Sequence, residues 1–406
     1  MNAVSPHKIR LKKAVGRVLL IGGGLFAGLL VAECVLRVMT FSEPQIYVPD
    51  QFVGTRLKAN FEGTWTKEGR SHFQLNSAGF RDIERSRAKP EGTFRIAVLG
   101  DSYVEALQVP LEKAFWSVLE TELADCDLPG HKDVEVLGFG VSGFGTGQQL
   151  LMLRHYVWDY EPDMVIVLMC PHNDLADNSR QLTNSVVRPF FSLKDDRLEL
   201  DNSFRQHPSY IYASKASTRF KVACINRSRV LQLYSRVRNG TGRTKSGDDA
   251  NSASRNNIEN ICYVPPETTA WRDAWELTER LVVQIHKEVE QRNVPFVLVT
   301  GSNGIQVDPR ESVREEFRKQ LGVTDLFYFE RRIQALATRH GIPAIGLSEQ
   351  MAQVAQQEQL FLHGFPNTPK GRGHWNADGH RLAAKLIAEQ LCDGLQQRSA
   401  PGDSSR

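Results

Sequence analysis

The stretch "FRIAVLGDSYVEALQVP", residues 94–110, opens as a buried strand and changes character within three residues. Residues 96–99 are continuously apolar, which is typical of a parallel strand covered on both faces. Gly100, Asp101 and Ser102 follow, and then a segment that can start a helix. Turn chemistry alone would explain them, since glycine supplies unusual dihedral angles and Asp or Ser caps helices. The alternative is that Ser102 is a nucleophile at the carboxyl end of a strand, where ligands bind in open α/β sheets.

The same alternation of strand and helix continues downstream. Segments 133–141 and 163–170 are predicted strands, and 146–157 is the predicted crossover helix between them. Two further helical patterns precede apolar strands over 294–300 and 341–347, and an amphipathic helix closes the pattern. Repeated strand–helix units predict an α/β fold, a parallel sheet with helices on both faces.

The pattern divides the chain into four parts. These are residues 1–39, a cytoplasmic stub and transmembrane anchor; 40–93, a small β-rich segment; 94–396, the α/β domain; and 397–406, a disordered tail. Residues 179–270 interrupt the domain as an insertion, with a hairpin predicted to turn at Asp195–Asp196 and a polar stretch over 239–257. Two roles remain open for the insertion, a lid or substrate wall and decoration away from any site.

The amino-terminal end has the pattern of a membrane anchor. An apolar run from Val18 to Val38, broken only by Glu33 and Arg37, is long enough to cross a bilayer. It follows a basic flank made of Lys8, Arg10, Lys12, Lys13 and Arg17. That flank predicts that this end stays in the cytoplasm and that the bulk of the chain lies outside. Glu33 and Arg37 stand four residues apart, so they can pair on one helix face.

A cleaved signal peptide is the alternative to the anchor. No small-x-small cleavage site follows the apolar run, and Glu33 directly before Cys34 is unlike a lipoprotein site. We therefore expect an uncleaved single-pass anchor in the inner (cell) membrane, with the α/β domain in the periplasm or outside the cell.

The net charge and the cysteines indicate which partners, metals and disulfides to expect. The 50 basic and 47 acidic residues leave a net charge of +3, which gives no case for nucleic-acid binding. No Cys/His spacing of the zinc type is present, so neither a metal nor a cofactor is expected. Cys170 and Cys392 are predicted to be buried thiols. Cys224 and Cys262 flank the polar stretch of the insertion and are the candidate disulfide pair in an exported domain.

Four short blocks fall at the ends of predicted strands or before the last helix. They are Gly100-Asp101-Ser102; "GFGVSGFGTG", residues 138–147, whose glycines let backbone approach a ligand; Asn173-Asp174; and "GRGHWNADGH", residues 371–380, with His374 and His380. Each has a structural explanation alone, as a tight turn, a helix cap or a buried histidine. Their coincidence at successive strand ends favours a functional site.

With these blocks the sequence resembles the SGNH (GDSL-like) serine hydrolases from about residue 94 to 395. "LNSAGFRD" (75–82) and "AECVLR" (32–37) also resemble membrane-tethered bacterial members. The resemblance implies a flavodoxin-like three-layer α/β/α sandwich with a parallel central sheet. It further implies that Ser102 is the nucleophile and His374 the base. The oxyanion hole would use the backbone N–H groups of Ser102 and Gly143 and the side-chain amide of Asn173. His380 would be structural.

The sequence departs from the family in one place. The family usually has an aspartate two or three residues before its histidine, and those positions here are Arg372 and Gly371. The candidates to orient the imidazole are Asp378 and a backbone carbonyl. A helix beginning near Ala377 would carry Asp378 away from His374, so the carbonyl is the prediction, with slow turnover as its consequence.

Three functions follow from these observations. The first is a membrane-anchored serine esterase that removes acyl groups, acetyl among them, from a glycan or small molecule. The second is an O-acyltransferase acting on an extracellular polysaccharide, with a sugar hydroxyl in place of water. The third is a catalytically silent glycan-binding protein, which the missing aspartate would explain.

Overall fold

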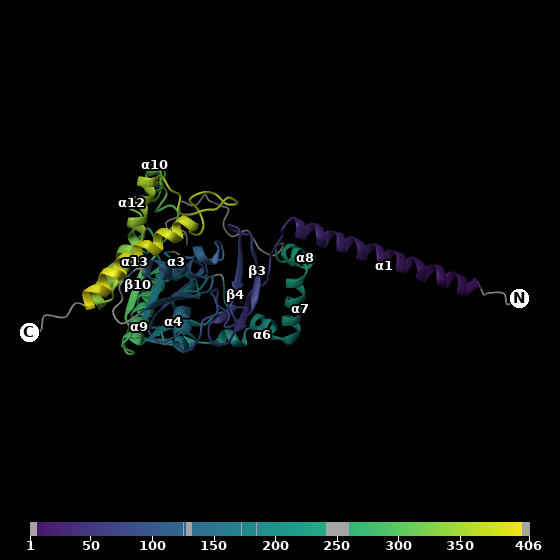
Figure 1. Cartoon of the computed structure of the whole chain (residues 1–406), viewed down its shortest axis with the longest axis horizontal. Helices are drawn as coiled ribbons and strands as arrows, with labels where there is room; N and C mark the ends of the chain where they lie inside the picture. Colours follow the sequence, from purple (N-terminus) through teal and green to yellow (C-terminus); the bar gives the residue numbers. More distant parts are fainter. Residues whose placement is uncertain are drawn as a thin grey trace, which may run out of the picture. The chain divides into compact units, whose positions relative to one another are not determined.

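The computed structural model describes residues 6–124, 126, 132–171, 173–183, 185–240 and 260–399 (Figure 1). Most of the polar stretch predicted over 239–257, and the tail beyond residue 399, lie outside the described residues. The chain forms two compact units, one made of Met1–Gln45 and Ala216–Asp248, the other of Ile46–Lys215 and Asp249–Arg406. The second unit holds the central sheet and all four predicted blocks.

The central sheet has five parallel strands in the order β11-β10-β7-β5-β6. The strands are β5 (Thr93–Gly100), β6 (Asp133–Gly140), β7 (Met164–Met169), β10 (Phe296–Thr300) and β11 (Ala344–Gly346). Numbered along the chain, this order is 2-1-3-4-5, the flavodoxin-like arrangement, whose switch point lies between β5 and β7. Every residue of β5 and β7 is buried, as their continuous apolar runs predict.

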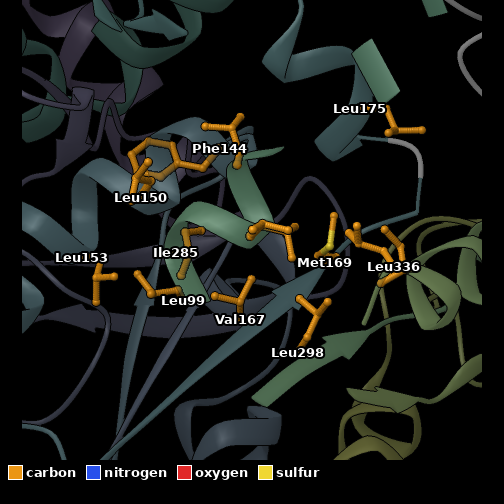
Figure 2. Close-up of a cluster of buried hydrophobic side chains, with 14 of the residues drawn as sticks. Leu99, Phe144, Leu150, Leu153, Val167, Met169, Leu175, Ile285, Leu298 and Leu336 are labelled. Carbon is orange, nitrogen blue, oxygen red and sulfur yellow. The ribbon is translucent and has the colours of Figure 1, made fainter. Parts of the chain in front are cut away.

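Helices cover both faces of this sheet, which confirms the predicted three-layer α/β/α class. Helices α4 (Thr146–His155), α9 (Thr269–Glu290) and α11 (Tyr328–His340) share one apolar cluster with alternate strand residues. Figure 2 labels four sheet side chains of that cluster, Leu99, Val167, Met169 and Leu298. The intervening strand residues enter a second cluster with α3 (Phe115–Ala124), α12 (Ser348–Glu358) and α13 (Ala377–Ser399).

The β-rich segment is built from two antiparallel hairpins. They are β1 (Tyr47–Asp50) with β2 (Gly54–Leu57), and β3 (Phe61–Trp65) with β4 (Ser71–Leu75). Side chains of both hairpins pack with Leu107, which lies shortly after Ser102 in the chain. The hairpins therefore contact the stretch that follows the predicted nucleophile.

The insertion contains the predicted hairpin, β8 (Phe190–Lys194) with β9 (Arg197–Asp201). Asp195 and Asp196 have φ angles of 46° and 63°, the left-handed values that a two-residue type I′ turn requires. Three helices follow that the sequence did not predict, α6 (Pro208–Ser214), α7 (Ala216–Arg227) and α8 (Arg229–Gly240). Helix α10 (Glu311–Leu321) was likewise not predicted, and short 3₁₀ helices span Leu111–Lys113, Val157–Tyr160 and Ser203–Gln206.

The cysteine predictions were partly wrong. Cys126 and Cys392 form a disulfide, with their Cα atoms 6.0 Å apart, whereas Cys224 and Cys262 are thiols that are not bonded to each other. Cys170 is the buried thiol that was expected. The bonded pair lies 266 residues apart, beside the ends of α3 and α13. Those helices share one apolar cluster, so the pairing depends on tertiary packing that cysteine spacing does not reveal.

Helix α1 (Pro6–Val38) contains the predicted anchor. Over Lys13–Val38 it is long and apolar enough to cross a membrane, a property it shares with signal sequences, and no other helix in the described ranges meets that test. Arg37 Nε donates to Glu33 Oε1 at 2.8 Å, which confirms the predicted pairing on one helix face.

Candidate active site

Ser102 begins a short helix at the carboxyl end of β5. Asp101 caps this helix, α2 (Ser102–Glu105), by accepting a hydrogen bond from the backbone N–H of Tyr103 at 3.0 Å. A Cβ at Gly100 would lie 2.4 Å from Val104 Cγ2, so strand and helix approach closely only because residue 100 is glycine. Capping and presentation of Ser102, the two explanations of this block, therefore occur together.

His374 lies beside Ser102 although 272 residues separate them in the chain. Its Nε2 is 2.8 Å from Ser102 Oγ, and it sits on the loop before α13. The loop is supported from behind by His363, whose Nδ1 lies 2.7 Å from the carbonyl oxygen of Gly373. Because a carbonyl oxygen can only accept, His363 carries its proton on Nδ1 and donates to Gly373. A neutral His363 then accepts on Nε2 from the Ser302 hydroxyl at 3.2 Å, while Ser302 Oγ accepts from the indole N–H of Trp375 at 3.0 Å.

The other ring nitrogen of His374 faces Glu68. Its Nδ1 is 2.5 Å from Glu68 Oε2, and its backbone N–H donates to Glu68 Oε1 at 2.6 Å. Glu68 lies on the turn between β3 and β4, outside the segment that resembles the family. The prediction of a backbone carbonyl or Asp378 at this position is therefore wrong. Asp378, on the first turn of α13, accepts a hydrogen bond from Arg381 Nη2 at 2.9 Å instead.

Two further features bring Glu68 to the histidine. Gly373 has a φ of +78°, and a Cβ there would lie 1.9 Å from Glu68 Oε1, so only glycine leaves room for the carboxylate. Asn367 fastens the turn that carries Glu68 to the loop that carries His374. Its Nδ2 donates to the carbonyl oxygens of Thr66 and Gly69, at 3.1 and 3.2 Å, and its Oδ1 accepts from the Gly69 N–H at 2.9 Å.

The two groups shift each other's pKa in opposite directions. Burial alone would lower the pKa of His374, but the hydrogen bond and negative charge of Glu68 outweigh it and raise that pKa above its ordinary value. Burial alone would raise the pKa of Glu68, but the hydrogen bonds and charge of His374 lower it below its ordinary value. The site therefore favours an ionised Glu68 and stabilises a proton arriving at His374.

Gly143 and Asn173 lie after strand ends, as predicted: they follow β6 and β7, the strands on the two sides of β5. Gly143 follows β6 with a φ of +75°, and among the described residues a Cβ there would lie within 4 Å of Arg188 Nη2 alone, at 3.8 Å. Its loop is held by Glu105, which accepts hydrogen bonds from the backbone N–H of Ser142 and from the Tyr47 hydroxyl. Asn173 opens α5 (Asn173–Asn178) after β7.

The other glycines of this block pack against protein instead of a ligand. A Cβ at Gly140 would lie 2.3 Å from the backbone nitrogen of Glu105, and one at Gly145 would lie 2.6 Å from Asn178 Oδ1. His380 is structural, as expected: its Nδ1 accepts from the backbone N–H of Phe115, and burial lowers its pKa to about 3. Within the described ranges, no group of three or more His, Cys, Asp or Glu side chains could hold a metal ion.

Arg81, in the "LNSAGFRD" motif, is a further residue that sequence reasoning did not assign. Its buried guanidinium donates to the carbonyl oxygens of Glu105, Ala106 and Val109, which follow Ser102. Arg81 thereby fixes the stretch that leaves the predicted nucleophile, and the β-rich segment supplies both Glu68 and this support.

No family model matches the chain. An arylesterase of Vibrio mimicus is 28% identical over 109 residues, which are 27% of this chain and 52% of that protein, so the match spans about half of the relative.

Two solved structures resemble the chain in fold. The acetyl xylan esterase AlAXEase has a TM-score of 0.36 and 13% identity, over 73% of this chain and 100% of that one. The acetylxylan esterase Axe2 from Geobacillus stearothermophilus has a TM-score of 0.37 and 11% identity, over 73% and 94%. The flavodoxin-like strand order, and the position of His374 beside Ser102, are the fold and the pairing that the resemblance to the SGNH (GDSL-like) hydrolases implies.

Proposed function

We propose that this chain is a membrane-anchored serine esterase that removes short acyl groups, such as acetyl, from a glycan or a small molecule. The observation that carries the proposal is the unbroken line of contacts from Glu68 through His374 to Ser102. A short acyl group is favoured because Ser102 is only 6% exposed. The silent glycan-binding alternative rested on a missing acid, and Glu68 occupies the position where that acid is needed.

The mechanism follows from the contacts. Ser102 Oγ attacks the ester carbonyl while His374 Nε2 takes the hydroxyl proton, and Glu68 Oε2 accepts the hydrogen bond from Nδ1–H. His374 then passes that proton to the leaving alkoxide, leaving an acyl-Ser102. Water, deprotonated by the same imidazole, attacks this ester; the bond from the acyl carbon to Ser102 Oγ breaks, the acid leaves, and the imidazolium returns its proton to Ser102 Oγ.

Three donors would stabilise the oxyanion of each tetrahedral intermediate. They are the backbone N–H groups of Ser102 and Gly143 and the side-chain amide of Asn173, which the ends of β5, β6 and β7 carry. The first N–H groups of a helix have no partner within it, so Ser102, at the start of α2, is suited to this role. Losing one such donor typically costs about a hundred- to a thousand-fold in turnover.

Two observations support an exported, tethered enzyme. The apolar part of α1 follows a basic flank, which favours retention of the amino terminus in the cytoplasm. The Cys126–Cys392 disulfide fits an oxidising compartment for the unit that contains the site. We propose the inner membrane as the location, with the catalytic unit on its periplasmic or outer side.

A fluorophosphonate probe tests the nucleophile. We expect the full chain in detergent to take up one probe molecule, on the peptide that contains Ser102, as seen by mass spectrometry after digestion. The matched control is Ser192→Ala, because Ser192 is an exposed serine on β8 that takes no part in the contacts of Ser102 and His374; this variant should still be labelled at Ser102. Labelling elsewhere, or none in a folded chain, would contradict the proposal.

Acetate release from p-nitrophenyl acetate, with and without an oligosaccharide, separates the two enzymatic hypotheses. Free acetate in both conditions supports an esterase. Acetylated sugar formed at the expense of acetate would favour the O-acyltransferase.

The pH profile follows from the raised pKa of His374. The imidazole accepts the Ser102 proton only when neutral, so kcat/KM should fall as the pH drops through that pKa. Because Glu68 raises it, the midpoint of the acid limb should lie above the ordinary value of 6.5. Glu68 itself stays ionised throughout this range, since its pKa is lowered. Rates on a neutral ester at constant ionic strength measure the midpoint, and a value below 6.5 would exclude this pairing.

A further inference from the structure

Helix α8 packs within its own unit through its polar face. The side chain of Gln232 is buried, and its Oε1 accepts hydrogen bonds from the backbone N–H of Glu43 at 2.8 Å and from Arg229 Nη1 at 3.0 Å. One turn further on, Ser235 Oγ accepts from Gln45 Nε2 at 2.9 Å. The connection that follows α1 therefore lies against polar side chains of α8.

The apolar face of the same helix points outward. Leu233, Tyr234 and Val237 are 37%, 63% and 58% exposed, and together with the half-buried Val230 they follow the spacing of one helix face. A helix on the surface of a water-soluble protein normally does the reverse, with its apolar stripe against the core. The inversion indicates that something apolar covers this stripe in the native setting.

The anchor helix holds α7 and α8 at their junction. The Glu33 carboxylate accepts hydrogen bonds from the backbone N–H groups of Arg229 and Val230, both at 3.0 Å, which are the first of α8. Arg37 Nη2 donates at 2.9 Å to the carbonyl oxygen of Arg227, the last residue of α7. An acid at a helix start and a base at a helix end are the favourable placements for both dipoles. The two charges inside the apolar run thus have a structural role.

This junction sits where α1 would leave a membrane. At about 1.5 Å per residue, the run from Val18 to Val38 is about 30 Å long, the thickness of the hydrocarbon core, and Glu33 lies about 22 Å along it. Figure 1 shows α8 beside that end of α1. The apolar stripe of α8 therefore belongs at the depth of the interface.

The composition of α7 and α8 fits the same depth. Residues 216–240 contain six basic and no acidic residues, namely Arg219, Lys221, Arg227, Arg229, Arg236 and Arg238. A helix with basic residues on one side, apolar residues on the other and an exposed tyrosine is typical of elements that lie in the headgroup region.

We propose that α8 is an interfacial helix whose face of Val230, Leu233, Tyr234 and Val237 lies in the bilayer around the anchor, with basic side chains of α7 and α8 near anionic headgroups. The proposal rests on the anchoring proposed above, and it gives the insertion a role as a membrane-contacting element. Two observations favour the bilayer over a second copy of the chain. The start of α8 is hydrogen-bonded to the end of the anchor helix. In addition, α7 and α8 contain basic residues and no acidic ones, as expected beside anionic headgroups.

Photocrosslinking of the full chain tests this placement. Tyr234→p-benzoylphenylalanine, reconstituted in nanodiscs of phosphatidylethanolamine and phosphatidylglycerol, should gain the mass of one phospholipid on the α8 peptide after irradiation. Within the described residues, the Tyr234 side chain forms no hydrogen bond that the replacement would remove. Fluorophosphonate labelling of Ser102 in the same sample shows whether the catalytic unit is folded. The matched control is the same replacement at Glu389, an exposed position on α13, which should give no lipid adduct.

A crosslinked dimer would overturn the proposal, because it would show that a second copy of the chain covers the stripe. An unreacted probe would also overturn it, because it would show that the stripe faces water. A sample that gives the lipid adduct without fluorophosphonate labelling would refute the esterase alone, so the two failures are distinguishable.

Glu33→Ala provides the second variant. It makes the anchor more apolar, so it cannot reduce insertion, but it removes the acceptor at the start of α8. In the chain that also carries p-benzoylphenylalanine at position 234, the lipid adduct should be largely lost. An undiminished adduct would show that α1 does not position α8, and would overturn that part of the proposal.

Discussion

The Glu68→Gln variant is expected to hydrolyse a short-chain ester about a thousand- to ten-thousand-fold more slowly than the unaltered chain, as when the acid of a serine-protease triad becomes its amide. The amide removes the negative charge that stabilises the imidazolium, and its N–H₂ group can hold the wrong tautomer of His374. KM should change little, because Glu68 contacts His374 and not the position of the substrate. Steady-state kinetics on p-nitrophenyl acetate measure the split between kcat and KM.

The pH profile shows whether Glu68 orients and charges the imidazole of His374 or only supports the fold. Because Glu68 is what raises the pKa of His374 against the effect of burial, the acid limb of the residual activity should move to lower pH in Glu68→Gln. Glu62→Gln is the matched control, since Glu62 is an exposed acid on β3 of the same hairpin, and it should behave as the unaltered chain. Retention of more than a tenth of the turnover in Glu68→Gln, with the acid limb unmoved, would exclude Glu68 as the orienting acid.

The close contact between Gly373 and the Glu68 carboxylate predicts a second substitution that should lower turnover in the same way as Glu68→Gln. A methyl group at position 373 would occupy the space of Glu68 Oε1, so Gly373→Ala should displace the acid while leaving its charge in place. If it reproduces the kinetic loss and the pH shift of Glu68→Gln, the two residues act through one contact.

The sheet was predictable because its strands carry the signal in consecutive residues. The buried apolar run of β5 ends at a glycine that lies against Val104, and β7 and β10 are likewise continuous buried apolar runs. The order of the strands was not predictable from periodicity, since pairing depends on contacts far apart in the chain. Helix α10 was missed because its apolar residues, Val313, Phe317 and Leu321, are only three among eight polar or charged ones, so its helical spacing gives a weak signal.

Helix α8 was missed for a different reason. Its stripe of Val230, Leu233, Tyr234 and Val237 has the correct spacing, but it lies within a short, strongly basic segment of an insertion that reads as polar. Only the hydrogen bonds that Gln232 and Ser235 accept from Glu43 and Gln45, in the connection after α1, show that the polar face is the inner one.

The candidate site was only partly predictable. Ser102, Gly143, Asn173 and His374 belong to short blocks that stand at strand ends or before a helix, so each is marked locally. Glu68 carries no such mark: it lies in "TKEGR", residues 66–70, which reads as a solvated hairpin turn, and it is 306 residues from His374. Its role depends on how Asn367 fastens that turn to the His374 loop.

Arg81→Met is expected to lower the free energy of unfolding by about 3–5 kcal/mol, the usual cost of removing one partner of a buried charged group. Met fills much of the same volume but leaves the carbonyl oxygens of Glu105, Ala106 and Val109 without their donor. It also removes the positive charge that offsets the buried carboxyl of Glu105, whose pKa burial raises. Burial lowers the pKa of Arg81 to about 10, so the guanidinium is still charged at neutral pH and that offset is present in the native chain.

The loss of fluorophosphonate labelling with increasing urea concentration measures the free energy of unfolding of the catalytic unit. Arg70→Met is the matched control, because Arg70 is exposed beside the Glu68 turn, and its loss should cost less than about 0.5 kcal/mol. Turnover of Arg81→Met should fall even where the chain stays folded, since Ala106 holds a left-handed φ of +50° at the end of α2 and its carbonyl is one that Arg81 fixes. A loss of stability below about 1 kcal/mol would show that those carbonyls find other donors. The "LNSAGFRD" motif would then support Ser102 by packing alone, and the β-rich segment would act on the site only through Glu68.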